Sequence, residues 1–153
     1  RDKYPVVEEK IALMKSVWTD EEAAYDGKHV RLSPSRVGPK PLQRPHPPLL
    51  LGVRPGAVGF RRVAAWADGW IPMGHHVVDT LEGDLKQLRE EWERVGRDPG
   101  DIRVTVLQAI RPDLADVLER FRQMPVDRVV VDIPSAGDEV LLPVLDQVAA
   151  GAF

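Results

Sequence analysis

The residues best suited to chemistry gather in a loop behind a short apolar run. Leu49–Leu51 is wholly apolar, and the glycine-rich segment that follows it leads into a helical pattern at Ala57. Glycine lets a backbone come close to a ligand, and the free amides at the start of a helix attract anions. Arg54 adds a positive charge and a fork of donors. The pattern predicts an anion-binding loop made of Gly52, Val53, Arg54, Gly56 and Ala57.

Histidine and arginine side chains follow other apolar runs at equivalent places. His75 and His76 come after Gly69–Pro72, where a histidine can donate to a ligand or transfer a proton. Adjacent histidines point in different directions, so we expect no metal site. Arg111 lies just past a later apolar run. The polar residues near the end of the last run are Asp132 and Ser135.

A structural role is the alternative for each of these residues. The glycine-rich loop is neither a GxGxxG fingerprint nor a Walker loop, so a plain turn with a solvated arginine also fits it. No acid–base pair stands out, because Glu90 and Glu91 fall on the predicted solvated face of a helix. The catalytic residues therefore stay unknown. The side chains predicted to lie in the core or at its edge are Trp66, Trp70 and Trp92.

The elements that must position these side chains alternate along the chain. Apolar runs without strict alternation predict parallel strands, and the 3.6-residue patterns between them predict helices. The predicted strands are 49–52, 69–72, 102–107 and 128–133, and the predicted helices are 57–66, 79–95, 113–124 and 137–149. Asp79 or Thr80 caps the helix over 79–95, and Gly96 ends it. Val129–Val131 does not alternate, which predicts a strand covered on both faces.

Residues 1–48 have a different character. The apolar stripe over residues 5–18 predicts a helix with Pro5 in its first turn. Asp26-Gly27 lies between short alternating segments and predicts a tight hairpin. Six prolines from Pro34 to Pro48 predict an extended loop. The whole order indicates an α/β fold with a parallel sheet, either a small doubly wound sheet or half of an eight-stranded barrel.

Composition excludes several classes of function. The 153 residues are enough for one domain, with 43% apolar and 29% charged residues. A net charge of −3 argues against a general nucleic-acid binder. The chain has no cysteine, which excludes disulfides and fits a reducing, cytoplasmic compartment. We expect neither a membrane span nor a signal peptide.

Several segments together resemble a known family. They are "EEKIALMKSVWTDEEAAYDGKHVRL", "PKPLQRPHPPLLLG", "RRVAAWADGWIPMG", "GRDPGDIRVTV" and "VDRVVVDIP". In this order they resemble the C-terminal half of luciferase-like monooxygenase-fold enzymes, and most of all the actinobacterial-type branch that uses coenzyme F420. The resemblance implies a (β/α)₈ TIM barrel, of which this chain covers roughly the last four βα units. Residues 1–153 would form one domain, with residues 19–48 as an irregular insertion segment beside the active site.

The resemblance also implies a function. It is an oxidoreductase that transfers a hydride between F420 and a small organic substrate, with the loop from Gly52 to Ala57 holding the cofactor's phosphate. The alternatives are an FMN-dependent monooxygenase of the same fold and a non-catalytic half-barrel that binds a phosphorylated ligand. This chain departs from the family pattern at Val53, where a second glycine is common, and at Pro55. The choice between F420 and FMN therefore stays open.

The resemblance further implies what lies outside these residues. The ring-binding pocket and the catalytic side chains of the family come from the first barrel strands, to which nothing here corresponds. We therefore expect a piece of a longer enzyme, inactive and prone to associate when alone. The full-length protein is expected to be a homodimer with no nucleic-acid or membrane partner.

Overall fold

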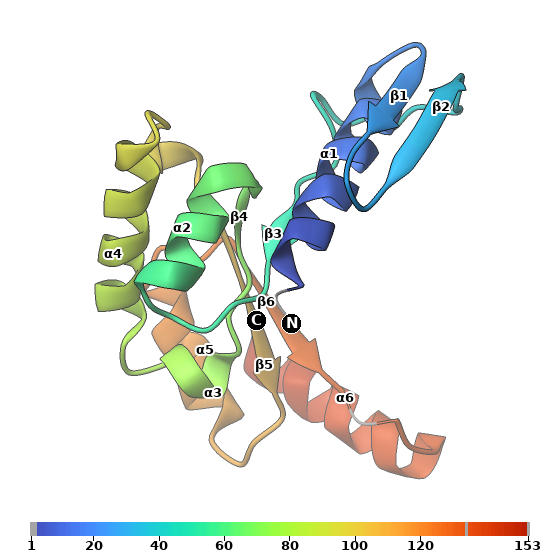
Figure 1. The fold of residues 1–153 in the computed structure, drawn as a ribbon. Helices are drawn as coiled ribbons and strands as arrows, with labels where there is room; N and C mark the ends of the chain where they lie inside the picture. Colours follow the sequence, from blue (N-terminus) through green and yellow to red (C-terminus); the bar gives the residue numbers. More distant parts are fainter. Residues whose placement is uncertain (1–2, 134, 153) are drawn as a thin grey trace. The chain divides into compact units, whose positions relative to one another are not determined.

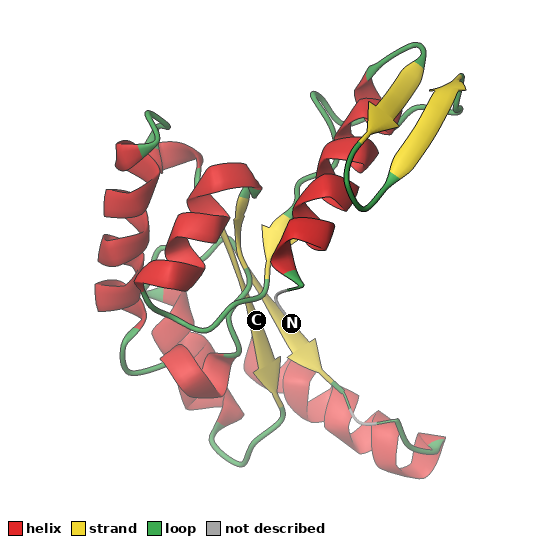
Figure 2. Cartoon of the chain, in the orientation of Figure 1, coloured by secondary structure: helices red, strands yellow, loops and turns green. Residues whose placement is uncertain are grey.

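The structure, a computed structural model, describes residues 3–133 and 135–152 (Figures 1 and 2). The chain divides into two units, Arg1–Pro48 and Leu49–Phe153, which are described separately below. The single domain expected over residues 1–153 stays a prediction. Among the described residues, no helix combines the length and the apolar character that a membrane crossing requires.

The first unit holds a helix and a hairpin. Helix α1 (Tyr4–Thr19) has Pro5 in its first turn, as predicted. Strands β1 (Ala23–Asp26) and β2 (Arg31–Ser35) pair antiparallel. The hairpin is confirmed, but the tight Asp-Gly turn is wrong. Asp26 pairs with Arg31, so the loop spans residues 27–30, and the Gly27 N–H donates to the Val30 carbonyl at 2.9 Å.

A carboxylate of α1 explains the wider turn. Glu9 accepts hydrogen bonds from the backbone amides of Lys28, His29 and Val30, at 3.1, 2.7 and 3.1 Å. Burial of Glu9 raises its pKa, but the three amide donors lower it more, so the net pKa lies below the ordinary value. Glu9 thus organises the hairpin loop.

The proline-rich segment is irregular from residue 36 onward, as predicted, but the predicted loop is wrong for Pro34 and Ser35, which belong to β2. Residues 36–48 contain neither helix nor strand. Pro34 lies within β2, which it can do because each strand of a two-stranded sheet is an edge. The Lys40 ammonium donates to the Val17 carbonyl at 2.6 Å, which ties this segment to the end of α1.

The second unit is an α/β layer. Its strands are β3 (Leu50–Leu51), β4 (Gly69–Trp70), β5 (Arg103–Ala109) and β6 (Arg128–Asp132). Its helices are α2 (Ala57–Trp66), α3 (Gly74–Val77), α4 (Leu81–Arg94), α5 (Leu114–Arg122) and α6 (Asp138–Ala152), with a 3₁₀ turn at Pro99–Asp101. The four predicted strands and four predicted helices are present. Within the described part of this unit, α3 and the 3₁₀ turn are additional.

The strand order decides between the two predicted sheet types. All four strands are parallel and lie in the order β3-β4-β5-β6, the same as along the chain. A doubly wound sheet reverses direction at a switch point, whereas a (β/α) barrel adds each strand beside the previous one. The sheet is therefore wound in the barrel manner.

The core lies between one face of this sheet and the helices. Helices α2 and α4 pack side by side against it (Figure 1). Trp70 and Trp92 are fully buried, and Trp66 is partly buried and packs against the core cluster, as predicted. The solvated position expected for Glu91 is wrong: it is 7% exposed and accepts a hydrogen bond from Arg94 at 2.7 Å, while Glu90 is exposed.

Strand β6 is not covered on both faces, contrary to prediction. Val129 and Val131 are partly buried, whereas Val130 between them is 40% exposed. The reason is the place of β6 at the end of the sheet order, with helices packed against one face only. The burial of successive residues in β6 therefore alternates, although all three central residues are apolar.

The ends of α4 agree with the prediction in part. Thr80 stands at the N-cap, but its hydroxyl donates to the Asp84 carboxylate at 2.7 Å and accepts no amide hydrogen bond. The expected side-chain cap is therefore wrong. Gly96, with φ of 75°, follows the helix and ends it, as predicted.

The middle of the sheet is held by a very short strand. Gly69 of β4 pairs with Leu50 on one side and with Arg103 on the other. A Cβ atom at position 69 would collide with the Arg103 carbonyl. Only glycine therefore fits between these two strands.

Candidate active site

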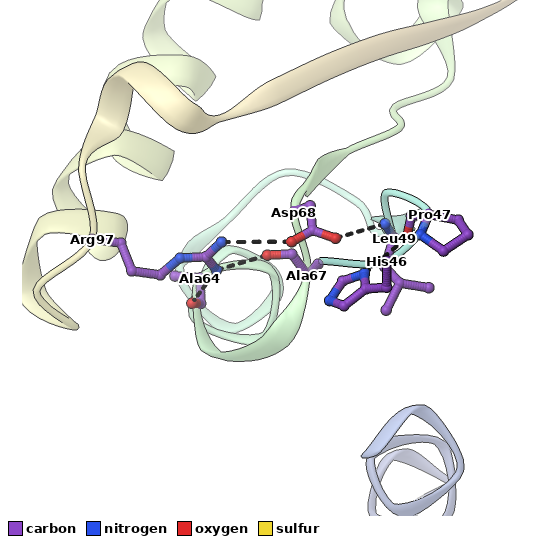
Figure 3. A network of polar contacts seen from close by, with 7 residues as sticks. All are labelled: His46, Pro47, Leu49, Ala64, Ala67, Asp68 and Arg97. Atoms are coloured by element: carbon purple, nitrogen blue, oxygen red, sulfur yellow. Dashed lines mark hydrogen bonds and ion pairs between the residues drawn. The ribbon is translucent and has the colours of Figure 1, made fainter. Parts of the chain in front are cut away.

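At the N-terminal ends of the strands, carboxylates occupy the free backbone donors. Asp68, just before β4, accepts from the Leu49 amide at 2.8 Å and returns its own amide to the Leu49 carbonyl at 2.7 Å (Figure 3). Asp127, just before β6, repeats this arrangement with Val104, at 2.6 and 2.9 Å. The same pair of hydrogen bonds therefore links β3 to β4 and β5 to β6.

Arg97 completes this end of the sheet. Its guanidinium donates to the Ala64 and Ala67 carbonyls at 3.0 and 2.7 Å, where α2 ends, and lies 3.9 Å from Asp68 (Figure 3). It also lies 3.7 Å from the centre of the Trp92 ring. At this end, Asp68, Asp127 and Arg97 thus pair with backbone groups of the strands and of α2.

A cavity lies at the C-terminal ends of the strands. This cavity of about 310 Å³ lies between the loop after β3, the end of β4, helix α3 and β5. Its lining residues are Gly52, Val53, Arg54, Pro55, Ile71, Met73, His76, Val77 and Leu107. The structure thus brings three of the loop residues predicted from the sequence together with His76.

The turn from the loop into α2 depends on a glycine and leaves backbone donors open. Gly56 stands at the N-cap with φ of 129° and ψ of 160°, a conformation that glycine adopts almost alone. Ala57 begins the helix and is exposed. Within the described residues, the amides of Arg54 and Ala57 have no hydrogen-bond acceptor and Arg54 makes no ion pair.

A buried indole supports this loop from below. The Trp70 Nε1–H donates to the Val53 carbonyl at 2.9 Å. Phe60 of α2 meets the Trp70 ring edge-on, with ring centres 5.1 Å apart. The sequence predicts that Trp70 lies in the core but does not predict this contact, because a hydrogen bond across 17 residues leaves no periodic signal.

The other predicted contact residues lie apart from this cavity. His75 is exposed and lies against His76 with ring centres 4.0 Å apart and the rings tilted by 49°, but it does not line the cavity. Arg111 forms a close ion pair with Asp113 and lines a separate groove between α5 and α6. The hydrogen bond between these two side chains raises the pKa of Arg111 and lowers the pKa of Asp113. Arg111 is therefore already neutralised by a neighbour.

The remaining polar candidates give no second site. Asp132 and Ser135 are exposed near the end of β6. Among the described residues, no group of three or more histidine and acidic side chains could hold a metal ion.

The donors around the cavity fit a phosphate. Arg54 is an exposed cation, and a guanidinium and free backbone amides such as those of Arg54 and Ala57 are donors that phosphate oxygens accept from. No atom lies within 4 Å of where a Cβ would stand on Gly56, so the turn is open to a ligand. The apolar side chains of Ile71, Met73 and Leu107 on the same cavity fit an uncharged organic portion beside the phosphate.

Comparison with known proteins identifies one family. The family described as luciferase-like monooxygenase matches residues 1–130. An uncharacterized protein of Mycobacterium tuberculosis is 32% identical over 145 residues, which are 95% of this chain and 49% of that protein. The chain thus spans about half the length of this relative.

Two similar proteins carry names that state a cofactor. An F420-dependent glucose-6-phosphate dehydrogenase of Kineococcus radiotolerans is 29% identical over 126 residues, covering 80% of this chain and 36% of that protein. An FMNH2-dependent dimethylsulfone monooxygenase of Pseudomonas putida is 28% identical over 88 residues, covering 58% of this chain and 24% of that protein.

Solved structures confirm the fold. An F420-dependent secondary alcohol dehydrogenase superposes with a TM-score of 0.56 at 19% identity, covering 76% of this chain and 35% of that one. The likeness and the strand order identify the sheet as part of a (β/α)₈ barrel.

Proposed function

Because the chain belongs to the luciferase-like monooxygenase family, we propose that the protein is an oxidoreductase that transfers a hydride between coenzyme F420 and a small organic substrate. The relative that is named as F420-dependent and covers 80% of this chain supports this cofactor. Since the chain spans about half the length of its relatives, the activity is proposed for the protein as a whole.

The observation that carries the proposal is the cavity at the C-terminal ends of β3, β4 and β5. In (β/α)₈ barrels, this end of the strands is where active sites lie. Arg54 would pair with the cofactor's phosphate, and the amides of Arg54 and Ala57 would donate to its oxygens. Gly52 and Val53 would bring the backbone alongside, and His76 would donate a hydrogen bond from α3. When bound, the deazaflavin would supply the centre that accepts or gives the hydride.

A titration of the full-length protein with F420 and, separately, with FMN tests the proposal. Tight binding of F420, with weaker binding or none for FMN, is the expected result. Quenching of ligand fluorescence and the shift in melting temperature are the two measurements. Failure of both cofactors to bind would overturn the proposal.

An FMN-dependent monooxygenase is the second candidate. The observation in its favour is the similarity to an FMNH2-dependent monooxygenase over 58% of this chain. Preferential FMN binding, together with oxygen consumption when FMN is reduced, would establish this alternative. The third hypothesis is a non-catalytic phosphate-binding module, which would bind a cofactor but never change its redox state. Turnover of bound F420 separates this hypothesis from the F420-dependent oxidoreductase.

The homodimer belongs to the same proposal, as does a cytoplasmic location. Light scattering after size-exclusion chromatography of the full-length protein should give twice the monomer mass. A monomer at the concentrations used for activity would contradict the dimer without affecting the proposed cofactor.

A further inference from the structure

The strongest unassigned feature is the support of the glycine-rich loop by a fully buried tryptophan. Trp70 ends β4 and has no exposed surface. Its Nε1–H donates to the Val53 carbonyl at 2.9 Å, which is a well-formed hydrogen bond. A core residue therefore reaches out of the core to one peptide group of the loop.

That hydrogen bond decides where the next amide points. The cis peptide bonds among the described residues are Gly38-Pro39 and Arg44-Pro45, so the bond between Val53 and Arg54 is trans. In a trans peptide the C=O and N–H groups point in opposite directions. Because the Val53 carbonyl is directed at the buried indole, the Arg54 N–H is directed away from Trp70.

A second contact turns the following carbonyl inward as well. A Cβ added to Gly59 would stand 2.7 Å from the Arg54 carbonyl oxygen and 3.2 Å from Val53 Cγ2. The Arg54 carbonyl thus lies directly against the first turn of α2. The Val53 carbonyl accepts a hydrogen bond from Trp70 and the Arg54 carbonyl lies against α2, while the Arg54 amide has no acceptor within the described residues.

We propose that Trp70 is a positioning residue for ligand binding. Its indole N–H holds the Val53–Arg54 peptide so that the Arg54 N–H faces the phosphate of the cofactor. Gly59 makes room for this arrangement. The inference rests on the proposed function, because it assumes that a phosphate binds at this loop.

Replacing Trp70 with phenylalanine tests the inference in the full-length protein. Trp70→Phe keeps an aromatic ring against Phe60 but removes the indole donor. The probes are F420 and its phosphate-free deazaflavin riboside, with FMN and riboflavin as a second pair. We expect Trp70→Phe to weaken binding of the phosphate-bearing probe about fivefold, the worth of one hydrogen bond, and to leave the phosphate-free probe unchanged.

Trp92→Phe is the matched control. Trp92 is also fully buried, but its Nε1 has no hydrogen-bond partner within the described residues, so losing that N–H should change neither affinity. Gly59→Ala is a second variant, which should show the same phosphate-selective loss by displacing the Arg54 carbonyl. It keeps the inference testable should Trp70→Phe fail to fold.

The outcomes separate the two proposals. A wild-type protein that binds the phosphate-bearing and phosphate-free probes equally well would refute the phosphate-binding loop itself. A wild-type preference that survives unchanged in Trp70→Phe and Gly59→Ala would refute only the positioning role. Equal weakening of both probes would also refute that role, because a general structural defect does not discriminate between them.

Discussion

The two ends of the parallel sheet in the second unit differ in how their backbone groups are hydrogen-bonded. At the N-terminal ends, Asp68 and Asp127 each accept an amide at the start of the preceding strand, and Arg97 takes up the last carbonyls of α2. At the C-terminal ends, the Val53 carbonyl of the loop after β3 accepts from Trp70, but the amides of Arg54 and Ala57 have no acceptors in the described structure.

The difference shows how a single sheet can separate stability from binding. Unsatisfied donors are costly when they are buried but useful when they are exposed beside a cavity. The carboxylates at the N-terminal end hold the strands in place, and the C-terminal end has exposed donors that the proposed phosphate could use. In (β/α)₈ barrels these two tasks fall to the same two ends.

Gly56→Ala should have the largest effect and attacks the C-terminal end directly. The backbone at Gly56, with φ of 129°, is strained for any side chain, so we expect a loss of about 2–3 kcal/mol in unfolding free energy. Chemical denaturation of the full-length protein measures it. The control is Gly83→Ala on α4, where nothing lies near the added Cβ and a gain of about 0.5–1 kcal/mol is expected. Equal effects in the two variants would contradict the role of Gly56.

Asp68→Ala should affect the N-terminal end alone. It leaves the Leu49 amide and Arg97 without their carboxylate, and we expect a loss of about 2 kcal/mol in unfolding free energy. Affinity for the cofactor should stay the same. Glu90→Ala removes the same charge from an exposed site on α4 and should change stability by less than about 0.5 kcal/mol. A drop in cofactor affinity in Asp68→Ala would show that the two ends are not independent.

Arg54→Gln should give the reverse pattern. The exposed guanidinium makes no ion pair within the described residues, so its loss should leave stability unchanged to within about 0.5 kcal/mol. Affinity for the phosphate-bearing cofactor should fall about tenfold, equivalent to about 1.4 kcal/mol. Raising the salt concentration should weaken wild-type binding more than binding by the variant. An unchanged affinity would remove Arg54 from the site.

Glu9 allows the smallest and most specific prediction. In the first unit, the Glu9 carboxylate accepts from the amides of the hairpin loop, whereas the exposed amides of the loop after β3 have no such acceptor in the described residues. Since the pKa of Glu9 is lowered in the folded state, its contribution is fully present above the ordinary value of 4.5 and is lost as pH falls through the lower folded pKa. The stability difference between wild type and Glu9→Gln should therefore shrink below pH 4.5. Denaturation between about pH 3 and pH 6 measures it, with Glu8→Gln as control, and a difference that stays constant would contradict it.

The elements of the second unit were predictable because local patterns specify them. Apolar runs with glycine or proline behind them marked the four strands, and the 3.6-residue pattern marked α4 despite its many charges. The order of strand and helix indicated a parallel sheet, but doubly wound and barrel topologies share that order. Only the pairing of β3 with β4 and of β4 with β5 separates them.

Several of the failures depend on contacts between residues that lie far apart along the chain. Glu9 acts on a loop about twenty residues away, and the widened hairpin followed from that contact. Burial of Glu91 and exposure of Val130 depend on which elements cover each face, which periodicity cannot show. Within the site, residue types and turn chemistry predicted the glycine-rich loop and His76. They could not predict that Arg111 would pair with Asp113.

Gly69 has a consequence for how the sheet finds its alignment. Strand β4 has two residues, too few for hydrogen bonds alone to define one pairing. Sliding it by one position would turn Trp70 out of the core. Sliding it by two would press the side chain of Ala67 or Ile71 into the Arg103 carbonyl, where only a bare Cα fits. The absence of a side chain at Gly69 thereby fixes the register of β4 between its two neighbouring strands.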